Sequence, residues 1–223
     1  MRLLVTKSIS LSFKERLLQQ GYSVFDIPLI EIKPIPFELK EVNQNVIFTS
    51  QNAVRILLKK QQPSHGLLED KKFFCVGEKV KSILKKNDQK VIKMAQNASE
   101  LAHYLLKNHK NEQFSFFCGT RRMDDLELIF AQNEMKLTII PIYDTLLTPK
   151  KIKLDVDGIV FYSPSAVESF FIKNKWPKNA YGFCIGNTTA NILKKHTEQF
   201  YVASQPKESS LLVKLKQHFS AYA

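Results

Sequence analysis

The sequence predicts two similar α/β lobes, each built around a parallel β-sheet. The first observation is an internal repeat: residues 46–54 resemble residues 159–167, which places Phe48 and Phe161 113 residues apart. The second is an alternation of short β-branched or aromatic runs with segments of helical periodicity, which is typical of parallel strands joined by helices. The repeat is far longer than a solenoid unit, so it indicates a duplicated half-protein rather than an array.

The elements follow one another in a regular order along the chain. The short apolar runs predict strands at 2–5, 24–27, 46–49, 73–76, 114–118, 137–140, 158–162, 182–185 and 200–202. Apolar residues at three- and four-residue spacing predict helices at 12–20, 52–60, 78–86, 99–107, 124–132, 166–173, 188–195 and 208–218. Most helices follow a strand after a short connection, which is the pattern of parallel α/β layers.

Two further segments have the extended, alternating pattern of strands. Residues 29–34 and 142–146 follow the matching Pro28 and Pro141. If the two segments pair, they form a two-stranded connector, and the chain passes between the lobes twice. The expected lobes are then residues 1–32 plus 146–223 and residues 33–145. Because clefts between domains are preferred ligand sites, we expect the active site in the cleft between the lobes.

The charge balance favours an anionic partner. The chain carries 33 Lys plus Arg against 21 Asp plus Glu, a net charge of +12. Nucleic acid is the first candidate for such a balance, but the aromatic residues occupy strand positions rather than alternating with basic ones on an exposed face. Several lysine pairs also end predicted helices, where they favour the helix dipole and face water. The charge therefore supports an anionic ligand without naming it, and we expect no nucleic-acid partner.

Cysteine usage and hydropathy indicate the cellular environment that we expect for the protein. Cys75, Cys118 and Cys184 each lie in or beside an apolar strand-like run and form no CxxC pair, so we expect buried thiols rather than disulfides or zinc ligands. No run approaches the ~18 apolar residues that span a bilayer, and the first residues lack the pattern of a signal peptide. We expect a cytoplasmic monomer with no membrane partner.

Small polar clusters stand between several predicted strands and the helices that follow. The clusters are Ser50-Gln51-Asn52, Gly77-Glu78, Ser163-Pro164-Ser165 and Gly186-Asn187-Thr188-Thr189. Carboxyl ends of strands face the ligand crevice in open α/β sheets, and helix starts offer free N–H groups to an anion. Ser, Thr and Asn are also preferred N-caps of any helix. Both interpretations stay open, although the matching positions in two repeats favour a shared ligand crevice.

The common catalytic signatures are absent from the sequence. It contains no GxGxxG, Walker, HExxH or GxSxG motif, and its five histidines show no ligand spacing. We therefore expect neither a metal ion nor an organic cofactor.

With its clusters taken together, the chain resembles the uroporphyrinogen-III synthase family. The resemblance is carried by the paired segments 48–54 and 161–167, and by Cys118-Gly119-Thr120-Arg121-Arg122, Tyr143-Asp144-Thr145 and Ile185-Gly186-Asn187-Thr188-Thr189-Ala190. These motifs run from about residue 46 to residue 212 in the family's order. Each motif alone is weak, but their order, spacing and duplication are specific.

The resemblance implies two lobes joined by a two-stranded connector and a cofactor-free enzyme of tetrapyrrole (haem) biosynthesis. Such a carbon–oxygen lyase, a cyclising hydro-lyase, converts the linear hydroxymethylbilane into uroporphyrinogen III. It removes water, closes the macrocycle and inverts ring D through an azafulvene and a spiro intermediate. The substrate carries eight carboxylates, which suits a basic chain with several helix starts. The alternative is a two-lobed protein that binds an anionic ligand without turnover.

The resemblance also implies roles for single residues. Tyr143 would donate a proton to the departing hydroxyl, although an aromatic residue that packs the connector is the other interpretation. Gly119 would let the backbone approach the ligand closely. The substrate-binding residues implied are Thr6, Lys7, Ser50, Gly77, Gly119, Arg122, Ser163, Ser165, Ala166, Gly186, Thr188 and Thr189. The chain departs from the family where Val80 replaces a frequent threonine, where Lys7 and Ser8 replace Arg-Pro, and where Met123 replaces a frequent arginine.

Overall fold

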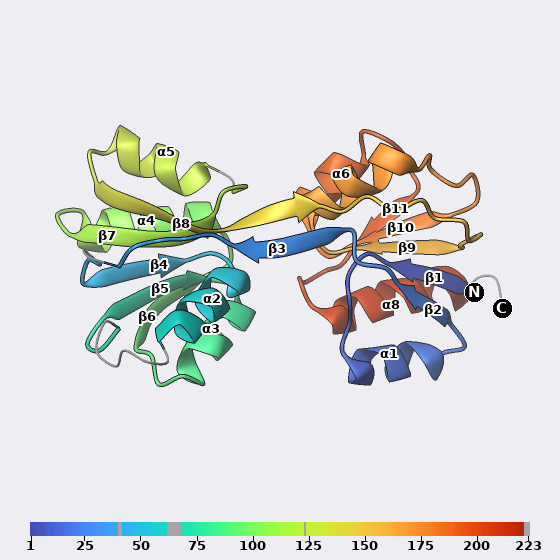
Figure 1. Cartoon of the computed structure of the whole chain (residues 1–223), viewed down its shortest axis with the longest axis horizontal. Helices are drawn as coiled ribbons and strands as arrows, with labels where there is room; N and C mark the ends of the chain where they lie inside the picture. Colours follow the sequence, from blue (N-terminus) through green and yellow to red (C-terminus); the bar gives the residue numbers. More distant parts are fainter. Residues whose placement is uncertain (40–41, 62–67, 123, 221–223) are drawn as a thin grey trace. The chain divides into compact units, whose positions relative to one another are not determined.

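The computed structural model describes residues 1–39, 42–61, 68–122 and 124–220. The chain forms two compact units, which are coloured by sequence in Figure 1. Unit 1 comprises Met1–Glu31 and Leu146–Ala223, and unit 2 comprises Ile32–Thr145. Within the described ranges, no helix combines the length and the apolar character needed to span a membrane.

Unit 1 is a five-stranded parallel sheet with helices on both faces. In spatial order its strands are β11 (Phe200–Val202), β10 (Tyr181–Cys184), β9 (Gly158–Phe161), β1 (Arg2–Val5) and β2 (Ser23–Asp26). Its helices are α1 (Leu11–Leu18), α6 (Pro164–Lys173), α7 (Asn187–Leu193) and α8 (Glu208–Phe219). Successive strand residues point to opposite faces: Val160 packs with α1 and α8, whereas Ile159 and Phe161 pack with α6 and α7. Figure 1 shows α6 and α8 on opposite sides of this sheet.

Unit 2 repeats this arrangement with one additional strand. Its spatial order is β3 (Ile30–Pro34), β8 (Lys136–Leu147), β7 (Gln113–Gly119), β4 (Asn45–Phe48), β5 (Lys72–Val76) and β6 (Val91–Ala95). Its helices are α2 (Gln51–Gln61), α3 (Glu78–Lys85), α4 (Ala98–His109) and α5 (Asp125–Gln132). Phe48 packs with α2 and α3 on one face, and Ile47 packs with α4 and α5 on the other. The prediction of two α/β lobes with parallel sheets is confirmed.

Each sheet has one point at which the direction of chain progression reverses. In unit 2 the chain runs from β4 outward to β5 and β6, but from β7 outward to β8 on the other side. In unit 1 it runs from β9 outward to β10 and β11, but from β1 outward to β2. The neighbouring pairs β4–β7 and β1–β9 are therefore the topological switch points. In open α/β sheets the ligand crevice lies beyond the carboxyl ends of the strands at such a point.

The chain passes between the units inside two paired strands. The unit boundaries fall within β3 and within β8, and these strands are neighbours in the sheet. The N–H of Thr148 donates to Leu29 (2.9 Å) and the N–H of Ile35 donates to Ile142 (3.1 Å), so the two strands are antiparallel, as Figure 1 shows. The predicted pairing of two extended segments is confirmed.

Two local features were not predicted. Strand β6 lacks the strong apolar pattern of the other strands because it is an edge strand, in which Ile92 is exposed and Val91, Lys93 and Met94 are half-buried. Strand β8 is continuous through Pro141. A proline has no N–H to donate to a ladder, and the β7–β8 register shifts between Cys118, the partner of Pro141, and Gly119.

The three cysteines are free and buried, which confirms the prediction of buried thiols. Burial raises the pKa of Cys75 to about 11, of Cys118 to about 11 and of Cys184 to about 12. The thiolate is the reactive species, so we expect iodoacetamide at pH 8 to leave the native protein unmodified for hours. In guanidinium chloride all three thiols should react. Mass spectrometry of the two samples tests this, and alkylation of a cysteine in the native protein at the denatured rate would contradict it.

Candidate active site

The switch point of unit 2 brings together three residues that the sequence had singled out. Ser50 follows β4, and Gly119 ends β7 beside it. Tyr143 lies in β8, which pairs with β7, and Tyr143 is the register partner of Gly119. The three residues come from separate parts of the sequence, and the order of the strands makes them neighbours.

Tyr143 is held at both its main chain and its hydroxyl. Its side chain is buried, and its hydroxyl donates to Ser50 Oγ at 3.0 Å. The N–H of Thr120 donates to the Tyr143 carbonyl at 2.9 Å. Burial raises the pKa of Tyr143, an effect that the hydrogen bond to Ser50 partly opposes. The phenol therefore keeps its proton at neutral pH, as a proton donor must.

Ser50 links this phenol to the start of α2. Its Oγ accepts the N–H of Asn52 at 3.2 Å, and its carbonyl accepts the N–H of Val54 at 3.3 Å. With the Tyr143 proton, Ser50 Oγ accepts two hydrogen bonds, which is the acceptor capacity of a hydroxyl. Its own proton can then be donated to a ligand. Ser50 is thus both an N-cap and a partner of the candidate proton donor.

Gly119 has no side chain because the Tyr143 ring occupies the space. An added Cβ at Gly119 would lie 2.6 Å from Tyr143 Cζ and 2.7 Å from Cε2, far inside van der Waals contact. The sequence had suggested that a ligand approaches the backbone at this glycine. In the structure it is the phenol ring that approaches.

Other predicted residues of unit 2 have partners of their own. The Arg122 guanidinium pairs with both carboxylate oxygens of Glu127, which raises its pKa, so a ligand carboxylate would have to share it. Gly77 has a φ of 85° at the start of α3, a conformation that side chains disfavour. Val80 is buried in the core against α2, which explains an apolar residue there. Met123 lies outside the described residues.

The switch point of unit 1 carries Thr6 and Lys7 after β1. Thr6 is buried, and its hydroxyl donates to the Val160 carbonyl at 2.9 Å; this bond joins β1 to β9 and leaves the hydroxyl committed to the fold. The Lys7 ammonium lies 3.4 Å from Glu208 Oε1 and 4.0 Å from the centroid of the Tyr162 ring. Neither Tyr162 nor Glu208 was predicted. The signal for Tyr162 was its place in the repeat, where the first copy has Thr49.

The starts of α6 and α7 complete the set. Ser163 Oγ accepts the N–H of Ala166 at 3.2 Å, so both residues serve the cap of α6, beside the half-buried Ser165. Gly186 begins α7 without a side-chain cap, Thr188 is exposed and Thr189 is buried. The capping interpretation is thus met at Ser50 and Ser163, and the substrate-binding roles stay predictions. The predicted cleft between the lobes also stays a prediction.

Among residues 1–39, 42–61, 68–122 and 124–220, no three His, Cys, Asp or Glu side chains lie close enough together to hold a metal ion. The two switch points instead carry hydroxyl groups, backbone N–H groups and cations. Such groups bind carboxylates and move protons.

Comparisons with known proteins agree with this architecture. The porphyrin biosynthesis protein HemD of Ruminiclostridium josui is 26% identical over 241 residues, and the match covers 96% of this chain and 48% of that protein. The chain therefore spans about half the length of this curated relative. The uroporphyrinogen-III synthetase of Helicobacter pylori has a similar structure, with a TM-score of 0.72, 22% identity and coverage of 98% of this chain and 100% of that one. A mutant uroporphyrinogen III synthase of the extremely thermophilic bacterium Thermus thermophilus gives a TM-score of 0.69 at 18% identity, with 99% of both chains covered.

At these identities the two solved structures establish the fold alone. The family follows from a separate comparison, in which residues 12–213 match the HEM4 family model, described as uroporphyrinogen-III synthase HemD. Because this match extends over most of the sequence, the chain belongs to the uroporphyrinogen-III synthase family.

Proposed function

We propose that this protein is a uroporphyrinogen-III synthase. It takes hydroxymethylbilane, removes water, closes the macrocycle and inverts the last ring to give uroporphyrinogen III. The observation that carries the proposal is the family match over residues 12–213. The Tyr143–Ser50 hydrogen bond at a switch point supports it, because this pair provides the proton that the chemistry needs.

In the proposed mechanism the two hydroxyl groups act in series. The pyrrole nitrogen supplies the electron pair that breaks the bond between the terminal carbon and its hydroxyl. The departing oxygen takes a proton from Ser50, which in turn takes the Tyr143 proton, and it leaves as water. The resulting azafulvene carbon then bonds to the substituted carbon of the last ring, which gives the spiro intermediate. The older methylene bond to that carbon breaks and re-forms at the free carbon of the same ring, and the proton which that carbon loses returns to the Ser50–Tyr143 pair. The protein supplies one proton and holds the chain ends together, and positioning of this kind is a large part of many rate enhancements.

The carboxylates of the substrate are the second requirement. The starts of α2 and α6 present backbone N–H groups beside Ser50 and Ser163, and helix N-termini favour anions. The net charge of +12 acts in the same direction. We propose that the substrate-binding residues named from the sequence, apart from Thr6 and Gly119, hold these carboxylates, and that the protein acts as a cytoplasmic monomer without a nucleic-acid partner.

A coupled assay tests the function directly. Hydroxymethylbilane is generated enzymatically in the presence of the protein, and the oxidised products are separated as uroporphyrin isomers. We expect isomer III to predominate, whereas heat-denatured protein should give isomer I, the product of spontaneous closure. Isomer I alone from the folded protein would overturn the proposal and favour a protein that binds without turnover.

A further inference from the structure

Unit 1 has its own group of side chains at its switch point, and the family resemblance accounts for only one of them. Strand β1 pairs with β9 so that Val5 is the partner of Val160, and both valines pack toward α1 and α8. Tyr162, two residues beyond Val160, packs against the same core, and the Lys7 ammonium lies over its ring. Lys7 and Tyr162 therefore lie on the α8 side of the carboxyl edge.

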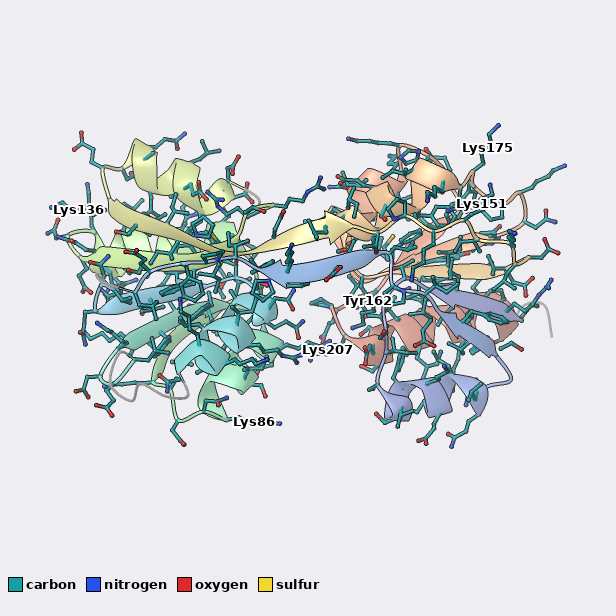
Figure 2. The ribbon with its side chains drawn as sticks, in the orientation of Figure 1. Lys86, Lys136, Lys151, Tyr162, Lys175 and Lys207 are labelled. Atoms are coloured by element: carbon teal, nitrogen blue, oxygen red, sulfur yellow. The ribbon has the colours of Figure 1, made fainter. Side chains whose placement is uncertain are left out.

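Helix α8 begins at the same place. Its first residue is Glu208, preceded by the N-cap Lys207. Figure 2 shows Tyr162 and Lys207 at the same end of unit 1. The Lys7 ammonium contacts both neighbours, at 3.4 Å from Glu208 Oε1 and 4.0 Å from the centre of the Tyr162 ring. One cation thus has an aromatic wall on one side and a carboxylate on another.

The Tyr162 side chain is suited to hold a cation by its ring rather than by its hydroxyl. Its oxygen is buried and has no hydrogen-bond partner among the residues that the structure describes. The ring packs against the core beside α8, so its position is fixed by apolar contacts. The face of such a ring attracts an ammonium group. It also reduces the number of conformers open to the long Lys7 side chain.

The carboxylate of Glu208 can be separated from Lys7 at small cost. The side chains of Lys7 and Glu208 are 37% and 25% exposed, and exposed ion pairs of this kind contribute little. Glu208 also stands in the first turn of α8, where the positive end of the helix dipole continues to stabilise it. Lys7 can therefore exchange one carboxylate for another without leaving Glu208 uncompensated.

We infer that the Lys7 ammonium binds one carboxylate of the substrate, that Tyr162 positions it, and that Glu208 is an internal counter-ion which the substrate carboxylate replaces. The inference rests on the proposed function, because it takes the polycarboxylate substrate as the ligand. It assigns Glu208 as a competitor of the substrate and Tyr162 as a positioning residue. The three residues together make a carboxylate subsite at the switch point of unit 1.

The test is a set of variants measured in two ways. KM and kcat for hydroxymethylbilane report on the reaction, and titration with uroporphyrin III, which carries the same eight carboxylates, reports on binding alone. Glu208→Gln should lower both KM and the uroporphyrin dissociation constant by about two- to fivefold, the size expected for an exposed pair. The control Glu198→Gln removes the same charge from a residue before β11 and should change neither.

Two further comparisons locate the effect. In a Lys7→Met background, Glu208→Gln should have no effect on KM, because the competition needs the ammonium. Tyr162→Leu should raise KM about two- to fivefold with a smaller change in kcat, and the conservative variant Tyr162→Phe, which keeps the ring, should rescue it. A structural role for Tyr162 would instead lower the melting temperature and leave KM unmoved.

The outcomes separate the inference from the proposed function. One outcome is that the wild-type protein makes isomer III, but Glu208→Gln leaves KM unchanged or raises it, or lowers KM equally in the Lys7→Met background. This outcome would overturn the subsite alone. A second outcome is that the wild-type protein makes only isomer I, while Glu208→Gln tightens the binding of uroporphyrin III and does so only when Lys7 is present. This outcome would support the subsite and overturn the synthase. A protein that neither reacts nor binds would overturn both.

Discussion

Replacing Tyr143 with phenylalanine is expected to lower kcat for uroporphyrinogen III formation by at least tenfold, and loss of a proton donor usually costs ~10²–10⁴-fold. KM should change little, because the ring remains and only the hydroxyl that donates to Ser50 is lost. Steady-state assays with separation of the isomers measure both quantities. An unchanged kcat would assign Tyr143 to packing alone.

Tyr22 provides a matched control for this substitution. Tyr143 and Tyr22 are each 7% exposed, and burial raises the pKa of both, but Tyr22 belongs to the core of unit 1. The Tyr22→Phe variant should therefore keep the wild-type kcat.

The pH dependence of kcat is a separate expectation. Because burial raises the pKa of Tyr143 above its usual 10.0, the protonated donor form persists as the pH rises. At any pH under 10, deprotonation of Tyr143 should therefore not reduce kcat. A fall in kcat as the pH rises just above neutrality would have to come from another group.

Alanine at Gly119 is expected to act on both stability and turnover. The new methyl group would lie 2.6 Å from the Tyr143 ring, and β7 cannot easily retreat because it is paired with β4 and with β8. The ring must therefore move, which breaks its alignment with Ser50. Overpacking of this kind costs about 1–3 kcal/mol, and we expect kcat to fall at least as far as in Tyr143→Phe. Thermal unfolding and the isomer assay measure the two effects.

Two further variants identify the cause. Gly182→Ala makes a similar collision, with its Cβ 2.5 Å from a Leu193 methyl carbon, but it lies inside β10. It should lower stability and leave the kcat of the folded protein unchanged. In a Tyr143→Ala background the ring is gone, so Gly119→Ala should then cost little stability. A full stability loss in that background would show that the ring is not what the methyl group meets.

The order of helices and strands could be predicted from the sequence because the spacing of apolar residues that identifies each element lies within that element. The repeat located the central strands β4 and β9, and their apolar residues fill both faces of each sheet. Strand β6 was missed because its pattern is that of a half-buried edge, where composition carries little information. The sequence predicted a strand at 137–140 and a separate extended segment at 142–146, but the two form the single strand β8, whose register on β7 shifts beside Gly119.

The candidate site was predictable as residue types but not as contacts. Ser50 and Tyr143 are 93 residues apart in the chain, and only the register of β8 on β7 brings the phenol over Gly119. The Lys7–Glu208 pair depends in the same way on where α8 begins relative to β1. No local pattern contains such a relation, because it is set by the assembly of the whole sheet.

The discontinuity of unit 1 has a consequence for how the protein is made. Unit 2 comes from one continuous stretch of chain, so its sheet can close while later residues are still being added at the ribosome. Strand β1 emerges before unit 2 but must wait for its neighbour β9, which lies on the far side of the whole of unit 2 in the chain. Until then the edge of β1 that will pair with β9 stays apolar and unpaired, which is the condition under which chaperones bind and chains aggregate. A strand that is synthesised before unit 2 is thus among the last to reach its final contacts.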